Sequence, residues 1–380
     1  MQASIYTVWQ QFAQLVKQVL PGVHGHRCKT LAWLVIGLML ARSVSSAQVA
    51  EVLRRVRGTQ ASSQERTFSR FLANTAIDAQ ALWQEFLPVL LAGWASQPDL
   101  TFVVDTTLLG DWAILVSFGI LHHSRVWPLG WRLMPRQQKW QEGQYAIIAQ
   151  FIQAVSPLVP QAQCRLLADS GLTRENLVEL CEQAGWHYLL RLELDKGYYV
   201  KEWDAQGRPL WQPLTEVLTQ PGQYWQGRVW LWKAHLRRTW LTAIWQEGEE
   251  APLVVISDEG AGRSSLRRYR KRMKVEATFQ DKKSRGFDLH LTHVRQWEHL
   301  DRLLLLLTLA IWWLAHLGAA CMHQGKRRLL DRGRRRDKSV LRLGRQWFLD
   351  LLQRAPSAAS LAHCLPFHRH GSSWRLCLRF

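Results

Sequence analysis

The chain has 380 residues, enough for two or three domains, and 47% of them are hydrophobic, which excludes a disordered chain. Its formal net charge at pH 7 is +19 and its pI is about 10.2, so its preferred partner is a polyanion. Nucleic acid is the commonest such partner, and an anionic membrane surface is the alternative. We expect no signal peptide, because glutamines interrupt the first residues and no apolar stretch follows a basic start.

Residues 1–96 are expected to form a helical region, because apolar residues recur at helical spacing and strand-like alternation is absent. One helix is predicted from Ser45 to Arg57. Ser62 lies three residues before Glu65, a capping-box pattern that predicts a second helix from Ser63 to Asn74.

The second helix places Phe68, Phe71 and Leu72 on an apolar face, so Arg66 and Arg70 point elsewhere. Two helices joined by a short turn, with basic side chains outward, are compatible with a helix-turn-helix that binds DNA. Most such helix pairs are packing units only, so both interpretations stay open. The DNA-binding interpretation makes Arg66 and Arg70 contacts to DNA.

From residue 97 to 195 the pattern changes to three strands followed by a helix, a strand, a helix and a strand. This is the element order of a ribonuclease-H-like core. The first strand ends in Asp105 and the fourth runs into Asp169. Because these strands lie side by side in such a core, the two carboxylates are expected to meet, although an aspartate at a strand end is often only a turn residue. The predicted elements are 101–107, 113–121, 126–134, 143–155, 164–168, 173–185 and 187–194.

Residues 196–252 are predicted to be a β-rich insertion that interrupts the core, because glycines and prolines punctuate short alternating runs. Seven tryptophans lie in this insertion: Trp203, Trp211, Trp225, Trp230, Trp232, Trp240 and Trp245. Residues 253–324 are expected to complete the core, beginning with an apolar strand from Leu253 to Ser257.

The segment from Leu303 to Met322 is nearly all apolar and just long enough to span a bilayer. We prefer a helix buried on all sides, since the segment continues the predicted catalytic region. Residues 325–380 form a basic C-terminal region that is expected to contact DNA or to pair two subunits. Within it, Val340–Leu352 is amphipathic enough for subunit pairing and equally for simple docking.

Four residues between the insertion and this apolar segment carry the strongest signal: Tyr269, Arg272, Glu276 and Lys283. At about 100° per residue on one α-helix, their side chains fall within an arc of roughly 60°. A carboxylate is therefore expected on a helix face between two cations and a phenol.

Metal-assisted cleavage of a phosphodiester needs divalent cations beside the scissile phosphate. Mg²⁺ takes oxygen ligands and keeps several waters, so a few carboxylates are enough. Asp105, Asp169 and Glu276 supply such a set. Arg272 and Lys283 could hold neighbouring phosphates, Arg272 in bidentate fashion.

The sequence resembles DDE transposases of bacterial cut-and-paste insertion sequences, which carry a Tyr-Arg-Glu-Lys (YREK) signature. Tyr269, Arg272, Glu276 and Lys283 match that signature. The stretch 66–74 is similar to a motif in the family's N-terminal region, and 102–107 and 166–171 look like its first and second catalytic strands. The resemblance covers roughly residues 30–345. It implies a ribonuclease-H-like core with a β-rich insertion, behind an all-α N-terminal DNA-binding region and ahead of a basic C-terminal tail.

By this resemblance, Asp105, Asp169 and Glu276 are the catalytic residues and bind two Mg²⁺ ions, with Mn²⁺ as a substitute. Arg272 and Lys283 would contact DNA near the cut end. Tyr269 would support a phosphate or the helix.

Such enzymes often cut the second strand through a DNA hairpin, with a flipped base stacked on a tryptophan of the insertion. Trp230, Trp232 and Trp240 are the candidates, and the sequence does not choose among them. The plain alternative is that these tryptophans form the core of the insertion.

The expected function is thus a DNA transposase that cleaves and joins double-stranded DNA at the terminal inverted repeats of its own element and at target DNA. The resemblance implies a homodimer in the DNA complex, a cytoplasmic, nucleoid-associated location and no membrane. The alternatives are an inactive or domesticated DNA-binding protein derived from a transposase, a stand-alone nuclease and a membrane-associated basic protein.

Overall fold

The computed structural model describes residues 2–123, 125–137, 143–195, 197–282, 286–331, 338–354, 365, 367–370 and 373–376. The chain divides into two compact units, and the first of them is built from both ends of the sequence. Unit 1 contains Met1–Ala95 and Gln280–Phe380, and unit 2 contains Ser96–Phe279.

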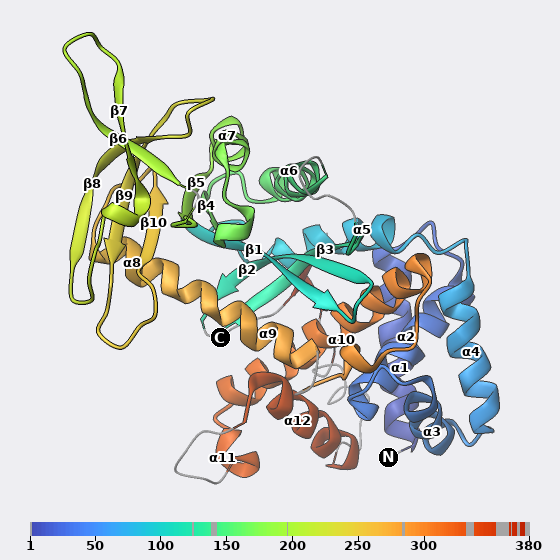
Figure 1. Cartoon of the computed structure of the whole chain (residues 1–380). Helices are drawn as coiled ribbons and strands as arrows, with labels where there is room; N and C mark the ends of the chain where they lie inside the picture. Colours follow the sequence, from blue (N-terminus) through green and yellow to red (C-terminus); the bar gives the residue numbers. More distant parts are fainter. Residues whose placement is uncertain are drawn as a thin grey trace. The chain divides into compact units, whose positions relative to one another are not determined.

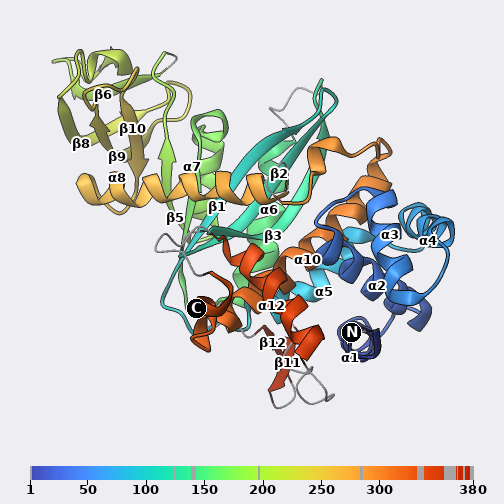
Figure 2. The same ribbon diagram turned by 90° about the horizontal axis from the view of Figure 1, so that it is seen from below.

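Unit 1 is mainly helical (Figures 1 and 2). Its helices are α1 (Gln2–Val19), α2 (Gly25–Ala41), α3 (Ser46–Arg57), α4 (Ala61–Ala73), α5 (Ala79–Leu91), α10 (Trp297–His323), α11 (Arg327–Leu330) and α12 (Val340–Arg354), with a 3-10 turn η6 (Leu289–Leu291) and a hairpin of β11 (Phe367–His370) and β12 (Ser373–Leu376).

The long apolar helix α10 forms the core of unit 1. It is long and apolar enough to cross a membrane, but 94% of its most apolar window is buried, as a core helix requires. It packs against α2, α4, α5 and α12, and the buried guanidinium of Arg302 donates to the carbonyl oxygens of Leu72 (2.6 Å) and Ile77 (2.8 Å). The helix therefore belongs to unit 1, whereas the sequence alone groups it with the catalytic core.

Helix α12 lies so close to α10 that glycine is needed where they cross. A Cβ on Gly344 would lie 1.9 Å from the carbonyl oxygen of Leu314, and one on Gly318 would lie 2.0 Å from that of Val340. The apolar side of α12, including Trp347 and Phe348, is buried in this contact. The amphipathic pattern of α12 is thus explained by docking within unit 1.

The helix pair α3–α4 follows the sequence prediction except at the start of α4. The predicted capping box is wrong, because α4 begins at Ala61 and Ser62 lies inside its first turn. The carboxylate of Glu65 instead accepts a hydrogen bond from Ser46 Oγ (3.2 Å) of α3. Buried Gln64 joins the two helices by accepting from Arg57 Nη1 (2.8 Å).

The two faces of α4 are as predicted. Phe68, Phe71 and Leu72 are buried, whereas Arg66 and Arg70 are exposed. The two arginines are therefore accessible to a partner.

Unit 2 is built on one mixed sheet of ten strands with the order β3-β2-β1-β4-β5-β10-β9-β8-β6-β7. The strands are β1 (Asp99–Leu109), β2 (Ala113–His122), β3 (Arg125–Pro135), β4 (Gln163–Ala168), β5 (His187–Arg191), β6 (Tyr198–Trp203), β7 (Pro209–Pro213), β8 (Tyr224–Leu231), β9 (Arg237–Ile244) and β10 (Leu253–Ser257). Its helices are α6 (Gln144–Val155), α7 (Glu175–Gln183), α8 (Arg263–Arg270) and α9 (Lys274–Lys282), whose last residues enter unit 1, and its 3-10 turns are η2 (Ser156–Leu158), η3 (Ser170–Leu172), η4 (Leu214–Glu216) and η5 (Lys271–Met273).

The first five strands have a mixed pairing. Strand β1 pairs antiparallel with β2 and parallel with β4, and β4 pairs parallel with β5. The strands predicted as a separate insertion extend the same sheet, because β10 pairs antiparallel with both β5 and β9. The tryptophan-rich strands are therefore connected through β10 and then β5 to the strands that carry the aspartates.

The two faces of this sheet are covered by different helices. Phe102 stacks on Phe118 (5.6 Å between centroids) and Trp186 (4.7 Å), and Phe118 stacks on Phe151 of α6. The adjacent Val103 belongs to a cluster that contains Leu266 and Tyr269 of α8. Because side chains alternate along a strand, Asp105 lies on the α8 face together with Val103.

Candidate active site at the strand ends

Asp105 and Asp169 are brought together by the parallel pairing of β1 and β4. Val103 is the register partner of Leu167, so two residues further along each strand Asp105 comes opposite Asp169. Each carboxylate is held by a backbone amide: Asp105 accepts from Thr106 N (2.7 Å) and Asp169 from Ser170 N (2.8 Å).

One guanidinium nitrogen joins the two carboxylates. Arg272 Nη2 lies 3.0 Å from Asp105 Oδ2 and 2.9 Å from Asp169 Oδ2. The Arg272 side chain is only 7% exposed, and its Nε has no hydrogen-bond partner among the described residues. The two carboxylates therefore hold Arg272 at this site.

Tyr269 and Arg191 complete the surroundings of Asp169. The hydroxyl of Tyr269 donates to Asp169 Oδ1 at 3.4 Å, and Arg191 Nη1 lies 3.8 Å from the same oxygen. Burial raises the pKa of the Tyr269 phenol, so this side chain is a neutral hydrogen-bond donor at neutral pH.

The electrostatics of Asp105 are those of a carboxylate that needs a cation. Burial raises its pKa above the ordinary value, while the neighbouring Arg272 and the Thr106 amide lower it. The charges of Asp169 and Glu276 raise the pKa of Asp105 further. A cation that replaced or joined Arg272 would therefore favour the ionised form.

Glu276 lies in the first turn of α9, is exposed, and acts on Asp105 through its charge. The single continuous helix predicted for the Tyr-Arg-Glu-Lys residues is wrong, because the 3-10 turn η5 separates α8 from α9. This turn contains Arg272, whose guanidinium donates hydrogen bonds to both aspartates. Lys283 lies outside the described residues.

A groove of about 710 Å³ opens beside the two aspartates. Its polar lining includes side chains from α6 and from the start of α7. The lining residues are Asp105, Thr106, Thr107, Leu108, Ile114, Gln144, Tyr145, Asp169, Gly171, Leu172, Arg174, Glu175 and Asn176. The site therefore has room for an extended substrate next to its carboxylates.

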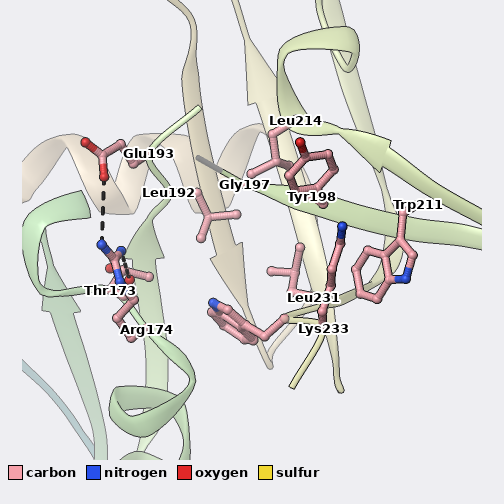
Figure 3. Close-up of a pocket in the computed structure, with 11 residues that line it drawn as sticks. Thr173, Arg174, Leu192, Glu193, Gly197, Tyr198, Trp211, Leu214, Leu231 and Lys233 are labelled. Atoms are coloured by element: carbon pink, nitrogen blue, oxygen red, sulfur yellow. Dashed lines mark hydrogen bonds and ion pairs between the residues drawn. The ribbon is translucent and has the colours of Figure 1, made fainter. Parts of the chain in front are cut away.

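Figure 3 shows a second pocket of about 340 Å³, which we call the aromatic pocket. It is lined by Thr173, Arg174, Leu192, Glu193, Gly197, Tyr198, Trp211, Leu214, Leu231, Trp232 and Lys233. The Nζ atom of Lys233 lies 4.2 Å from the centre of the Tyr198 ring and 5.5 Å from the Trp211 ring. Because Arg174 lines both cavities, the aromatic pocket is next to the carboxylate site.

The three tryptophans singled out from the sequence have different surroundings. Trp232 lines the aromatic pocket and has a positive φ of 61°. Trp230 and Trp240 lie elsewhere, with the guanidinium groups of Arg238 and Arg228 over their rings. Trp211 and Lys233 were not singled out from the sequence, because only the pairing of β6, β7 and β8 brings them together.

A separate cluster of possible metal ligands lies at the opposite ends of the central strands, beside the start of β5 and the end of β10. Ligand atoms of His187, Asp258 and Glu259 lie within 4.8 Å of one another. His187 starts β5, which runs parallel to β4, so this cluster is at the end opposite to Asp169. Asp258 pairs with His187 at 2.7 Å and Glu259 with buried Arg165, so these acids already have partners.

Comparison with known proteins agrees with the chemistry of the strand-end site. A family model described as a transposase DDE domain matches residues 143–313, which is less than half of the chain. No curated protein matches the sequence. The matched segment includes Asp169, Arg272 and Glu276, while Asp105 precedes it. The match supports a DDE transposase, an enzyme class that binds DNA and uses divalent metal ions.

Proposed function

We propose that the protein is a Mg²⁺-dependent DNA transposase of the cut-and-paste type with a YREK signature. The observation that carries the proposal is the convergence of Asp105 and Asp169 on Arg272, at the ends of two parallel strands. The strand order β3-β2-β1-β4-β5, with helices on both faces, supports a ribonuclease-H-like core. The family match over the segment that carries Asp169, Arg272 and Glu276 supports the same proposal.

The carboxylate site fits a divalent cation. Two carboxylate oxygens already lie about one hydrogen-bond length from a single cationic nitrogen, and the donor set contains only oxygen, which suits Mg²⁺ or Mn²⁺. In our proposal Asp105, Asp169 and Glu276 hold the metal. When bound, Mg²⁺ activates the attacking water or 3′ hydroxyl and stabilises the leaving oxygen.

The protein's own cations position the DNA. If a metal took the place of the Arg272 guanidinium between the two carboxylates, that planar group would suit a neighbouring phosphate. Lys283 is proposed as a second phosphate contact near the cut end. Tyr269 holds Asp169 through its neutral hydroxyl and so fixes the orientation of one metal ligand.

The aromatic pocket is proposed to hold a base flipped out of the duplex during hairpin formation. Trp232 provides a ring face on which a base could stack, and Lys233, which lies over the Trp211 ring, provides a cation for its phosphate. The shared Arg174 supports this role, because a flipped base would have to lie next to the cut bond. Among the three candidates from the sequence, Trp232 is therefore our choice.

The remaining parts of the proposal concern the partners. We propose that Arg66 and Arg70 contact the terminal inverted repeats, which their exposure supports. The enzyme would act as a homodimer on double-stranded DNA, in the bacterial cytoplasm and associated with the nucleoid.

A cleavage and joining assay tests the proposal. The substrate is a plasmid that carries the ends of the element, with Mg²⁺ or with a chelator. We expect metal-dependent excision by the wild type and none by Asp105→Asn or Glu276→Ala, with end binding retained in both variants. Asp258→Asn is the matched control, because that carboxylate lies at the opposite end of the sheet and should leave excision intact.

The other outcomes separate the alternatives. Excision by Asp105→Asn at the wild-type rate would overturn the proposal. Equal activity of Glu276→Ala and wild type would move the third ligand to another residue. End binding without any excision would favour an inactive DNA-binding descendant, and nicked DNA without joined product would favour a nuclease.

A further inference from the structure

The strands of the tryptophan-rich region carry arginines and aromatic rings in direct cross-strand register. Strands β8 and β9 are antiparallel, and their partners include Arg228 opposite Trp240 and Trp230 opposite Arg238. Residues directly opposite in a sheet point to the same face, so these four side chains share one face. We call this surface, together with Tyr224 of β8 and Arg263 of α8, the arginine–aromatic face.

Each arginine of this face lies over an aromatic ring. The guanidinium carbon is 5.2 Å from the ring centre in Arg228–Trp240, 5.9 Å in Arg238–Trp230 and 5.4 Å in Arg263–Tyr224. The three arginines are exposed and the three rings are partly buried. The rings therefore act as supports that restrict the arginine side chains while their N–H groups remain open to a partner.

The strands and the helix of this face contribute only positive charge, although Arg237 and Arg268 are paired with glutamates from other elements. Strands β8 and β9 and helix α8 together contain seven arginines and no acidic residue. Several restricted guanidinium groups on one surface suit a partner with regularly spaced anionic groups. The face is also continuous with the candidate active site, because α8 leads from Arg263 directly to the turn that contains Arg272.

We propose that the arginine–aromatic face binds the sugar-phosphate backbone of duplex DNA beside the cut end. This inference rests on the proposed function, which brings DNA to Arg272. Helix α8 is about 10 Å long from Arg263 to Arg270 at 1.5 Å per residue. That length corresponds to roughly three base-pair steps of 3.4 Å, so the face contacts phosphates within the first turn of the duplex next to the cut.

The arrangement favours backbone contacts over base stacking. A ring that already has a guanidinium over it offers no free face on that side to a base, whereas the guanidinium edges are suited to phosphate oxygens. Binding by this face is therefore independent of sequence and sensitive to salt. It differs in both respects from the stacking proposed for the aromatic pocket.

The test compares two double variants that remove the same charge from the same region. Arg228→Ala/Arg238→Ala removes two arginines of the face. Arg208→Ala/Arg237→Ala is the control, since Arg208 is paired with Asp204 and Arg237 with Glu182, away from the face. The affinity for a short duplex of random sequence is measured across a series of salt concentrations by fluorescence anisotropy, and thermal melting confirms that each variant is folded.

We expect the slope of log K against log salt to fall by about 1.8 in the face variant, at about 0.9 for each phosphate that the variant no longer neutralises. The control should keep the wild-type slope. The variant Arg228→Lys/Arg238→Lys should recover most of the slope but not the full affinity, because lysine keeps the charge without the planar stack. If the face variant and the control had equal slopes, the proposal would be overturned.

Two further results separate this inference from the proposed function. A larger loss of affinity for a single-stranded oligonucleotide than for the duplex would mean base stacking, and would also overturn the proposal. If excision fails in wild type while the slope still falls in the face variant, the backbone-binding face stands and the transposase does not. If excision succeeds and the slope is unchanged, the transposase stands and the backbone-binding face does not.

Discussion

Trp232 combines two properties that rarely occur together in a large aromatic residue: a left-handed backbone, with φ of 61°, and a side chain that lines a cavity. A positive φ in such a residue is strained by about 1–3 kcal/mol, and strain of this kind collects at ligand sites. The neighbouring Lys233 adds a cation to the same pocket. These observations make Trp232 suitable for a substitution that separates stability from binding.

Replacing Trp232 by glycine is expected to leave the fold intact, because glycine adopts a positive φ without strain. The variant should still bind the element's ends but lose about 1–3 kcal/mol of base stacking. A fluorescent base analogue at the flipped position would report this as a smaller emission change on binding. Trp203→Ala is the control, since Trp203 is an exposed tryptophan of the same region that does not line the pocket; an equal loss there would contradict the assignment.

His122, at the end of β2, is expected to limit acid stability. Burial and the neighbouring His123 lower the pKa of His122 to about 4, whereas an unfolded histidine titrates near about 6.5. His122 resists protonation in the folded state. Its contribution to the free energy of unfolding is therefore fully present above pH ~6.5 and is lost as the pH falls towards the folded pKa. The loss should reach roughly 2–3 kcal/mol near pH 4.

This loss can be measured by urea unfolding between pH 4 and pH 7. The variant His122→Asn should show a flatter pH dependence, because its side chain does not titrate. Parallel curves for variant and wild type would show that His122 is not the group responsible.

The pair Asp105 and Asp169 was predictable from sequence because it depends on strand order and on the alternation of side chains. Strand order and side-chain alternation can both be inferred from local sequence patterns. The arginines over Trp230 and Trp240 were not predictable, since they depend on the cross-strand register of β8 and β9. A one-residue shift in that register would separate every such pair.

At the scale of elements, the strands β1–β5 and β10 were predicted within a few residues because turn residues separate short β-rich runs, whereas β6–β9 were predicted only as a β-rich segment. The helical segment around Arg272 was not. A sequence pattern cannot show the 3-10 turn η5, which coincides with an arginine held by two carboxylates from distant strands. The predicted start of α4 was also wrong because of a contact between distant residues: the Glu65 carboxylate accepts a hydrogen bond from Ser46 of α3 and does not cap its own helix.

The crossing of α10 and α12 gives a prediction for an element. Gly344→Ala would place a methyl group 1.9 Å from the carbonyl oxygen of Leu314, so the two helices must move apart. We expect a loss of about 3 kcal/mol or more in the free energy of unfolding, at the upper end for overpacked cores. Gly22→Ala is the control, because nothing lies within 4 Å of a Cβ there. Chemical denaturation measures both, and equal stability of the two variants would contradict the close crossing.

At the scale of the whole molecule, all the described residues of the candidate active site belong to unit 2. Asp105, Asp169, Arg272 and Glu276 fall between Ser96 and Phe279. We therefore expect residues 96–279, produced alone, to fold and to gain thermal stability on addition of Mn²⁺ or Mg²⁺. The same fragment with Asp105→Asn should gain less. A fragment that melts identically with metal and with chelator would place an essential ligand in the rest of the chain.

Building unit 1 from both ends of the sequence also has a consequence for synthesis on the ribosome. The apolar residues of α2 pack against α10, which is made only after all of unit 2. At about 5–20 residues per second, the nascent helices α1–α5 wait roughly 10–40 seconds for that partner. During this time their apolar surfaces are exposed to chaperones or to other nascent chains. A messenger RNA truncated before α10 would therefore yield an aggregation-prone product in which unit 1 cannot complete its fold.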